Sequence, residues 1–156
     1  MDDNKRLRIP NLDVKLSPAE IAVTQTRQFQ RLFHLKQLGL AYLVYPAATH
    51  TRGLHSIQCL HEATRILQSL ESLGGKDTTE AATKQVRMAA LLHDIGHIPF
   101  SHTLEDEHVV FPKHDRPERV KASLELLKEE LKPESRALVE DALPILEAIS
   151  GPAVAS

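Results

Sequence analysis

The stretch LLHDIGHIPFSH, Leu91–His102, holds three of the chain's nine histidines and one aspartate. It follows an apolar run whose spacing predicts a buried helix end. Burying His93 beside Asp94 costs free energy unless something pairs them. A divalent cation is one such partner, because imidazole nitrogen and carboxylate oxygen both coordinate Mn, Fe, Co, Ni or Zn. The stretch therefore predicts a metal site; the alternative is a helix end that merely carries surplus imidazoles.

A further ligand has to come from another segment, because the adjacent side chains of His93 and Asp94 project in different directions. His55 is the best candidate, since it lies near the start of a predicted helix over 52–73. His61 lies six residues further on and points in an opposing direction, so only one of the two is expected to face the site. A single histidine is more often a packed core residue or a helix-end cation. The coincidence of several positions favours the metal site.

Capping signals and helical periodicity predict the elements that position these residues. SPAE (17–20) forms a capping box with Ser at the N-cap, Pro at N1 and Glu at N3, and it opens a helix that Gly39 ends. Apolar residues recurring at three and four predict the long helix from about 52 to 73. A third helix is predicted from Thr79 into His93, where Gly96 and Pro99 follow.

The last third of the chain carries two more helix starts. DRPE (115–118) is a second capping box, and it opens a predicted helix to about residue 131. Pro133 starts another helix, which is kinked or ended near Pro144. No segment shows sustained alternation with a period of two, so we expect an all-α fold of about five to seven helices. The expected domain covers 17–156, preceded by an irregular arm over 1–16.

Composition excludes several classes of protein. The 156 residues, 42% hydrophobic and 26% charged, fit one globular domain. A net charge of -2 indicates no general attraction to nucleic acid or to an anionic membrane. The single cysteine, Cys59, suits a reducing compartment. With no apolar run of about 18 residues and no apolar N-terminal signal, we expect a cytoplasmic or nuclear protein without a membrane segment, and we take cytoplasmic as the prediction.

Two long blocks resemble the HD-domain phosphohydrolases, specifically their deoxynucleoside triphosphate triphosphohydrolase branch. The blocks are FQRLFHLKQLGLAYLVYPAATHTRGLHS (29–56) and ALLHDIGHIPFSH (90–102). The resemblance covers most of the chain from about Phe29 to Asp115. A bare His-Asp dipeptide is a weak signal, whereas two long blocks in the right order are a strong one. The resemblance implies an HD-domain helical bundle that binds a divalent metal ion (Mn, Mg, Fe, Co, Ni or Zn).

The resemblance also implies roles for individual residues. His55, His93 and Asp94 would be metal ligands. Gln37 and Arg52 would contact the nucleotide, and the forked cation of Arg52 suits a phosphate.

Four further residues match catalytic positions of the family. His97 and His102 would line the triphosphate and assist proton transfer, Glu105 would orient His102, and His114 would belong to a later catalytic pair. Simpler interpretations remain for two of them. His102 follows Ser101 at a predicted helix start, and Glu105 lies in an acidic run that is often a solvated helix face.

The chain departs from the family pattern near its end. The pattern closes with one more metal-binding Asp in an Asp-x-Asp-Arg/Lys-x-Asp-Tyr context, and no such stretch is present. Asp141 and Glu147 are the late acids available, and the default for both is the surface of a helix. Two explanations stay open: the chain is a fragment truncated before the last metal Asp, which makes the domain incomplete, or it is a degenerate member without that ligand.

The leading hypothesis is a metal-dependent phosphohydrolase that releases deoxynucleoside and triphosphate from a deoxynucleoside triphosphate (dNTP). The alternative is a non-catalytic nucleotide-binding or regulatory module. A third hypothesis, hydrolysis of another nucleotide, is disfavoured by the His-x-Pro-Phe-Ser-His extension. The resemblance also suggests a homo-oligomer.

Overall fold

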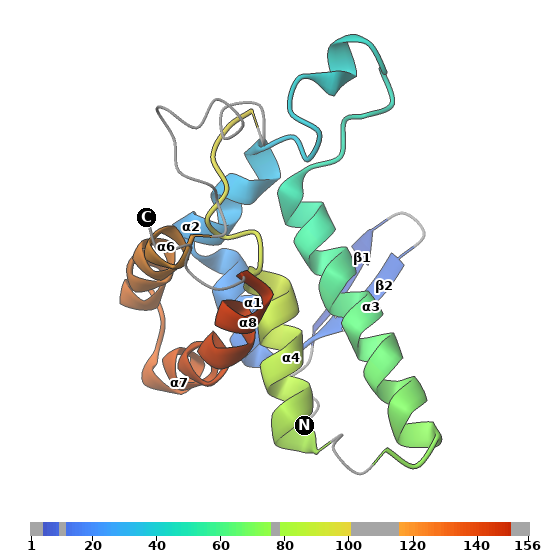
Figure 1. The fold of residues 1–156 in the computed structure, drawn as a ribbon, viewed down its shortest axis with the longest axis vertical. Helices are drawn as coiled ribbons and strands as arrows, with labels where there is room; N and C mark the ends of the chain where they lie inside the picture. The colour runs from blue at the N-terminus through green and yellow to red at the C-terminus, as the bar shows by residue number, and fades with distance from the viewer. Residues whose placement is uncertain (1–4, 10–11, 76–78, 101–115, 151–156) are drawn as a thin grey trace.

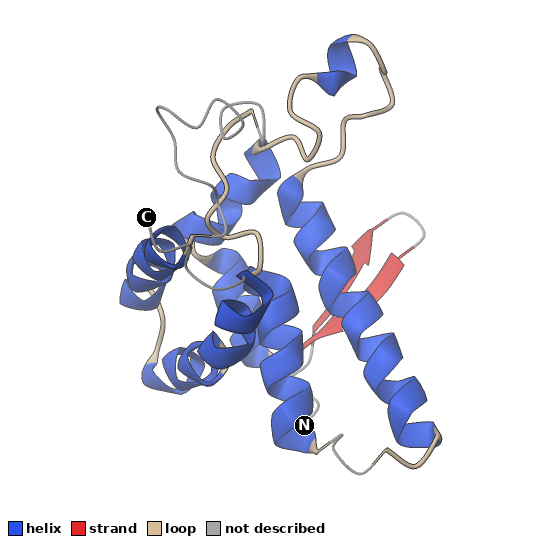
Figure 2. Ribbon diagram, viewed as in Figure 1, coloured by secondary structure: helices blue, strands red, loops and turns tan. Residues whose placement is uncertain are grey.

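The structure is a computed structural model that describes residues 5–9, 12–75, 79–100 and 116–150. Two long antiparallel helices, α3 (Arg52–Ser72) and α4 (Glu80–Leu92), lie side by side, with α3 along one side of the molecule (Figure 1). Helices α7 and α8 pack against α4, and α1 packs against α7. The remaining helices are α1 (Pro18–Gln25), α2 (Arg27–Gln30), α6 (Pro117–Glu129), α7 (Pro133–Asp141) and α8 (Leu143–Ser150). Figure 2 shows that helix dominates the described part of the chain, so the predicted all-α class is confirmed.

Side-chain caps start the helices that carry the site. The predicted capping box of α1 is present: Glu20 N donates to Ser17 Oγ at 3.3 Å, and Ser17 N donates to Glu20 Oε2 at 2.7 Å. The Thr51 hydroxyl caps α3 and the Thr79 hydroxyl caps α4. The predicted starts of these three helices are therefore confirmed, and each start has a local physical cause.

The helix expected from Ser17 to Gly39 is broken, and this prediction was wrong. Thr26 adopts an extended conformation with ψ 150°, donates from its hydroxyl to Val23 O at 2.7 Å and accepts from Phe29 N at 3.3 Å. Its side chain thus closes α1 and begins α2, because threonine can replace helical backbone bonds locally. Two 3₁₀ turns, Arg31–His34 and Ala41–Leu43, follow α2.

The N-terminal segment contains a β-hairpin where an irregular arm was expected. Strands β1 (Lys5–Ile9) and β2 (Leu12–Leu16) pair antiparallel, with Ile9 opposite Leu12. Val14 and Leu16 are buried while Asp13 and Lys15 are exposed, which is the two-residue period of a strand. This alternation is too short to stand out in the sequence, and a two-stranded sheet gains its stability from packing, here against α3.

The C-terminal helices begin at prolines. Helix α6 follows Arg116, which makes no side-chain cap hydrogen bond, and the capping box predicted at 115–118 depends on Asp115, which lies outside the described residues. Pro117 starts the helix because its fixed φ suits the first helical position. The predicted interruption near Pro144 is confirmed: α7 ends at Asp141 and α8 begins at Leu143.

A buried ion pair connects the hairpin, α1 and α4. Arg87 donates from Nε and Nη2 to the two carboxylate oxygens of Glu20, each at 2.8 Å, and Nη2 also donates to Lys15 O. The Arg87 guanidinium further contacts the Thr64 hydroxyl on α3. Such a two-point contact fixes geometry as well as charge. It sets the position of α4, whose last turn carries the candidate site.

Candidate metal centre

Two histidines from different helices meet at one end of the α3–α4 pair. His55 lies in the first turn of α3 and His93 directly follows the last residue of α4. Their Nε2 atoms are 3.3 Å apart, with ring centroids separated by 5.2 Å. His93 Nδ1 lies 2.8 Å from Ala90 O, which favours a proton on Nδ1 and leaves the lone pair of Nε2 directed at His55. A backbone carbonyl that orients an imidazole in this way is typical of metal-binding histidines.

Cys59 is a third donor in this group, and the sequence analysis did not assign it to the site. Its Sγ lies 3.5 Å from His55 Nε2, and one donor atom from each of His55, Cys59 and His93 lies within 4.8 Å of the others. The available signal was its spacing: residues four apart on a helix share a face. The described residues therefore contain a His-Cys-His group able to hold a metal ion.

Asp94 is buried next to this group and is held by Arg52. Arg52 Nη1 donates to Asp94 Oδ2 at 2.7 Å, and the two side chains are 1% and 6% exposed. The other carboxylate oxygen, Oδ1, is 3.4 Å from Nε2 of both His93 and His97. Arg52 Nη2 also reaches Gln37 O at 3.4 Å. Five predicted site residues are thus brought together, and the backbone of Gln37 lies beside them.

The surroundings keep the Asp94 carboxylate ionised. Burial alone raises its pKa, but the hydrogen bond from His97 and the charges of His93, His97 and Arg52 outweigh burial and hold the pKa well below its usual range. The pKa of His55 is lowered, chiefly by burial, against the attraction of Asp94. A lowered pKa favours the neutral imidazole, which is the form that binds a metal.

Two arginines hold the backbone that follows His93. Arg31 donates to the carbonyl oxygens of Ile95 and His97, and Arg119 Nη2 donates to Gly96 O at 2.9 Å. Burial and the nearby Arg119 cation lower the pKa of Arg31, yet an arginine remains charged. Charge-assisted bonds to three consecutive carbonyls fix the path of this loop and the position of the His97 backbone.

The remaining candidate residues either lie outside the described ranges or stand apart from the histidine cluster. His102, Glu105 and His114 lie outside the described residues. The late acids Asp141 and Glu147 are both exposed, and neither belongs to the metal-capable group found among the described residues.

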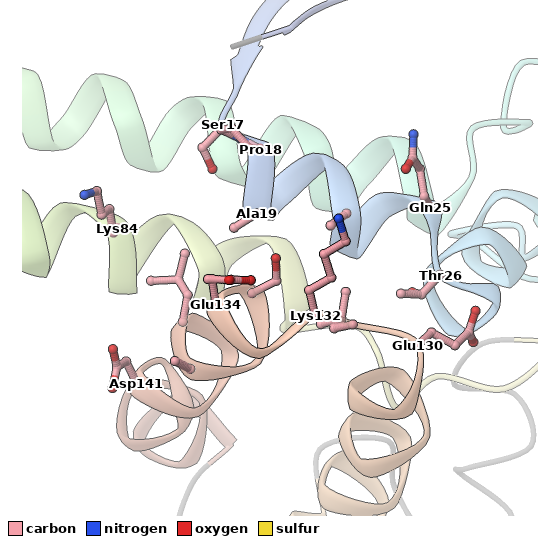
Figure 3. A pocket seen from close by; sticks show the side chains of 15 residues that line it. Ser17, Pro18, Ala19, Gln25, Thr26, Lys84, Glu130, Lys132, Glu134 and Asp141 are labelled. Carbon is pink, nitrogen blue, oxygen red and sulfur yellow. The ribbon is translucent and has the colours of Figure 1, made fainter. Parts of the chain in front are cut away.

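A groove of about 850 Å³ lies away from this centre, along α1 and α7 (Figure 3). Its wall mixes Lys84 and Lys132 with Glu130, Glu134 and Asp141. None of the residues that line it belongs to the histidine cluster, so its size does not make it the site.

Comparison with known proteins identifies a family and several relatives. The family model described as the HD domain matches residues 52–155. An uncharacterized protein of Methanocaldococcus jannaschii is 44% identical over 93 residues, covering 60% of this chain and 19% of that protein. The human deoxynucleoside triphosphate triphosphohydrolase SAMHD1 is 38% identical over 93 residues, covering 59% of this chain and 15% of that protein. The chain therefore spans about a fifth or less of the length of these relatives.

A solved structure shows the same fold over nearly the whole chain. A hypothetical protein from Aquifex aeolicus is similar with a TM-score of 0.64 and 34% identity, over 94% of this chain and 41% of that one. No helix within the described ranges has the length and apolarity needed to cross a membrane. The family match covers well over half of the chain and includes His55, His93, Asp94 and His97. This protein belongs to the HD-domain family.

Proposed function

We propose that this chain carries the metal-binding core of a phosphohydrolase that acts on deoxynucleoside triphosphates and releases deoxynucleoside and triphosphate. The observation that carries the proposal is the convergence of His55, His93, buried Asp94 and His97 at one end of the α3–α4 pair. The similarity to proteins named as deoxynucleoside triphosphate triphosphohydrolases supports this class of substrate.

The donor set fits a divalent cation. Imidazole nitrogens from two helices, with a carboxylate nearby, are ligands that first-row divalent metals accept. Such an ion, when bound, supplies Lewis-acid activation of water and of a phosphoryl oxygen. We propose His55, His93 and Asp94 as its ligands.

The chain's own residues would orient this site and move protons. The Ala90 carbonyl orients His93, and Arg52 fixes the position of the Asp94 carboxylate. We propose that His97, which contacts Asp94, donates a proton to the leaving oxygen. The nucleotide contacts of Gln37 and Arg52, and the catalytic roles of His102, Glu105 and His114, belong to the same proposal.

The test is product analysis with matched histidine variants. The chain is incubated with Mn²⁺, Co²⁺ or Zn²⁺ and each deoxynucleoside triphosphate, and triphosphate and deoxynucleoside are measured. We expect both products from the wild type, their loss in His55→Ala, and their retention in His61→Ala, a histidine of α3 outside the metal-capable group. Absence of any hydrolysis with metal confirmed bound, or release of pyrophosphate in place of triphosphate, would contradict the proposal.

A second candidate, a non-catalytic nucleotide-binding module, is favoured by one observation. The late acids Asp141 and Glu147 are exposed and lie outside the metal-capable group of the described residues, so neither supplies the carboxylate that closes the family pattern. This candidate expects a deoxynucleoside triphosphate to raise the melting temperature without being hydrolysed, and expects His97→Ala to leave that stabilisation unchanged. Hydrolysis lost in His97→Ala would decide for the enzyme.

We also propose that the chain forms a homo-oligomer, which the family resemblance suggests. We propose the cytoplasm as its location, because a chain with a single cysteine suits a reducing compartment. Light scattering after size-exclusion chromatography measures the oligomeric state directly.

A further inference from the structure

We propose that Arg31 and Arg119 are positioning residues, which hold His97 against Asp94 by fixing the backbone turn on which both lie. The inference rests on the proposed function in one respect, that His97 donates a proton during hydrolysis. It goes beyond that function, because neither arginine belongs to the proposed set of metal ligands, substrate contacts and catalytic residues.

The turn that the arginines hold directly follows α4. His97 N donates to Asp94 O at 3.1 Å, and Ile95 N donates to Leu92 O at 2.9 Å. Residues 95–97 are all buried, and carbonyl oxygens at the C-terminal end of a helix have no donors from the helix itself. Gly96 lacks a side chain, so its backbone has more conformational freedom than that of other residues. Donors from other elements are therefore needed to keep this buried turn in one conformation.

The two arginines supply these donors from two separate elements. Arg31 begins the 3₁₀ turn after α2, and its Nη1 and Nη2 donate to His97 O and Ile95 O. Arg119 lies in the first turn of α6, and its Nη2 donates to Gly96 O at 2.9 Å. Helix α2 packs against α6, which brings both guanidinium groups to the same turn. Each carbonyl from 95 to 97 is thus bound, so rotating any of these peptide groups breaks a charge-assisted bond.

The electrostatics of this arrangement favour a role in the turn itself. Burial and the nearby Arg119 cation lower the pKa of Arg31, so two like charges lie close together at a cost in free energy. The carbonyl oxygens at the C-terminal end of α4 carry partial negative charge and attract both cations. Local rules of stability are broken most often at functional sites. The pairing of two cations beside a candidate catalytic histidine therefore points to positioning.

The contact between His97 and Asp94 depends on this turn. His97 Nε2 lies 3.4 Å from Asp94 Oδ1, and the His97 side chain is 1% exposed. Proton transfer requires the donor atom within hydrogen-bond distance of the accepting oxygen, and a displacement of about 1 Å can lower a rate by about 100-fold. Loss of either arginine should therefore lower kcat more than it changes KM.

The first test needs no substrate: it measures hydrogen exchange at the backbone amides of Ile95 and His97 by NMR. We expect Arg31→Ala and Arg119→Ala each to raise exchange at these two amides by at least about tenfold, while amides in the middle of α3 stay near the wild-type rate. The matched control is Arg136→Ala, which removes a 3.1 Å bond from an arginine to a backbone carbonyl in α7 and should leave both amides unchanged.

The second test is the steady-state kinetics of triphosphate release. We expect both alanine variants to lower kcat by about 10- to 100-fold with KM within about threefold of the wild type, and Arg136→Ala to change neither. Lysine variants give a further distinction. Arg31→Lys can bind only one of two carbonyls and should recover little of the rate, whereas Arg119→Lys can still donate to Gly96 O and should recover most of it.

The outcomes separate this inference from the proposed function. Unchanged exchange at His97 in both alanine variants would overturn the inference, and so would faster exchange without a fall in kcat. A wild-type chain that hydrolyses no nucleotide contradicts the proposed function, and hydrogen exchange alone then decides whether the arginines hold the turn. If Arg31→Ala does not fold, Arg31→Lys takes its place, and its exchange at His97 should still exceed that of the wild type.

Discussion

The two halves of α3 have the same secondary structure and different surroundings. In the first half, residues 52–60, Arg52, Gly53, Ser56, Ile57 and Leu60 are all buried. In the second half, residues 61–72, no residue is buried by the described parts of the chain, and Ile66 and Leu70 are 59% and 47% exposed. The buried half carries His55 and Cys59. An apolar helical pattern therefore predicts a helix but does not show which part of that helix packs against the rest of the protein. The candidate site lies in the part that is packed.

The two halves of α3 should differ most in the unfolding free energy that is lost when an ion pair is removed. Arg52→Ala leaves Asp94 buried without its nearest cation, which we expect to lower the free energy of unfolding by about 3–5 kcal/mol. The matched control is Arg65→Ala, whose partner Glu62 is exposed, with an expected loss of about 1 kcal/mol or less. Urea unfolding measures both. Equal losses would contradict the division of α3.

Leucine truncation tests the same comparison in apolar packing. Leu60 is fully buried, so Leu60→Ala should cost about 2–5 kcal/mol through lost contacts and a residual cavity. Leu70→Ala should stay within about 0.5 kcal/mol, because nearly half of Leu70 is exposed. Each change in unfolding free energy is measured from the shift in the denaturant midpoint, provided that the dependence of the unfolding free energy on denaturant stays the same. A costly Leu70→Ala would show that a partner covers this surface in solution.

Two glycines at opposite ends of α3 should be sensitive for different reasons. A Cβ on Gly53 would lie 2.7 Å from Cδ1 of Phe33, so Gly53→Ala should cost about 1–3 kcal/mol by overpacking. Gly74 has φ +81° and no atom within 4 Å of an added Cβ, so Gly74→Ala should cost about 1 kcal/mol from the backbone alone. The second variant Phe33→Leu separates the two mechanisms: it should reduce the cost at Gly53 and leave the cost at Gly74 unchanged.

The smallest effect is expected at the exposed apolar surface. Ile66→Ser removes an apolar side chain that is already mostly in water, so the unfolding free energy should change by no more than about 0.5 kcal/mol. Thermal unfolding, combined with light scattering, measures stability and oligomeric state together. A change in oligomeric state would identify the second half of α3 as an interface between chains.

Local signals predicted most of the helices, and non-local packing accounts for the main errors. The Ser17, Thr51 and Thr79 caps act within one turn, so their effects are readable from sequence. The N-terminal hairpin depends on Val14 and Leu16 packing into the helical core, which no local pattern encodes. The helix break at Thr26 is only partly readable from the sequence. Its hydroxyl can end a helix, but threonine also occurs within helices, so the sequence did not predict the break.

The sequence by itself determined which residue types stand in the HD-type motif and where the helices that carry His55 and His93 begin. The tertiary structure alone decided which donors face one another. Packing of α3 against α4 brings Nε2 of His55 and His93 together, adds the sulfur of Cys59 and joins Arg52 to Asp94 across 42 positions of the chain. The physical reason is that caps and periodicity act over a few residues, whereas coordination distances depend on how two helices are placed by the whole core.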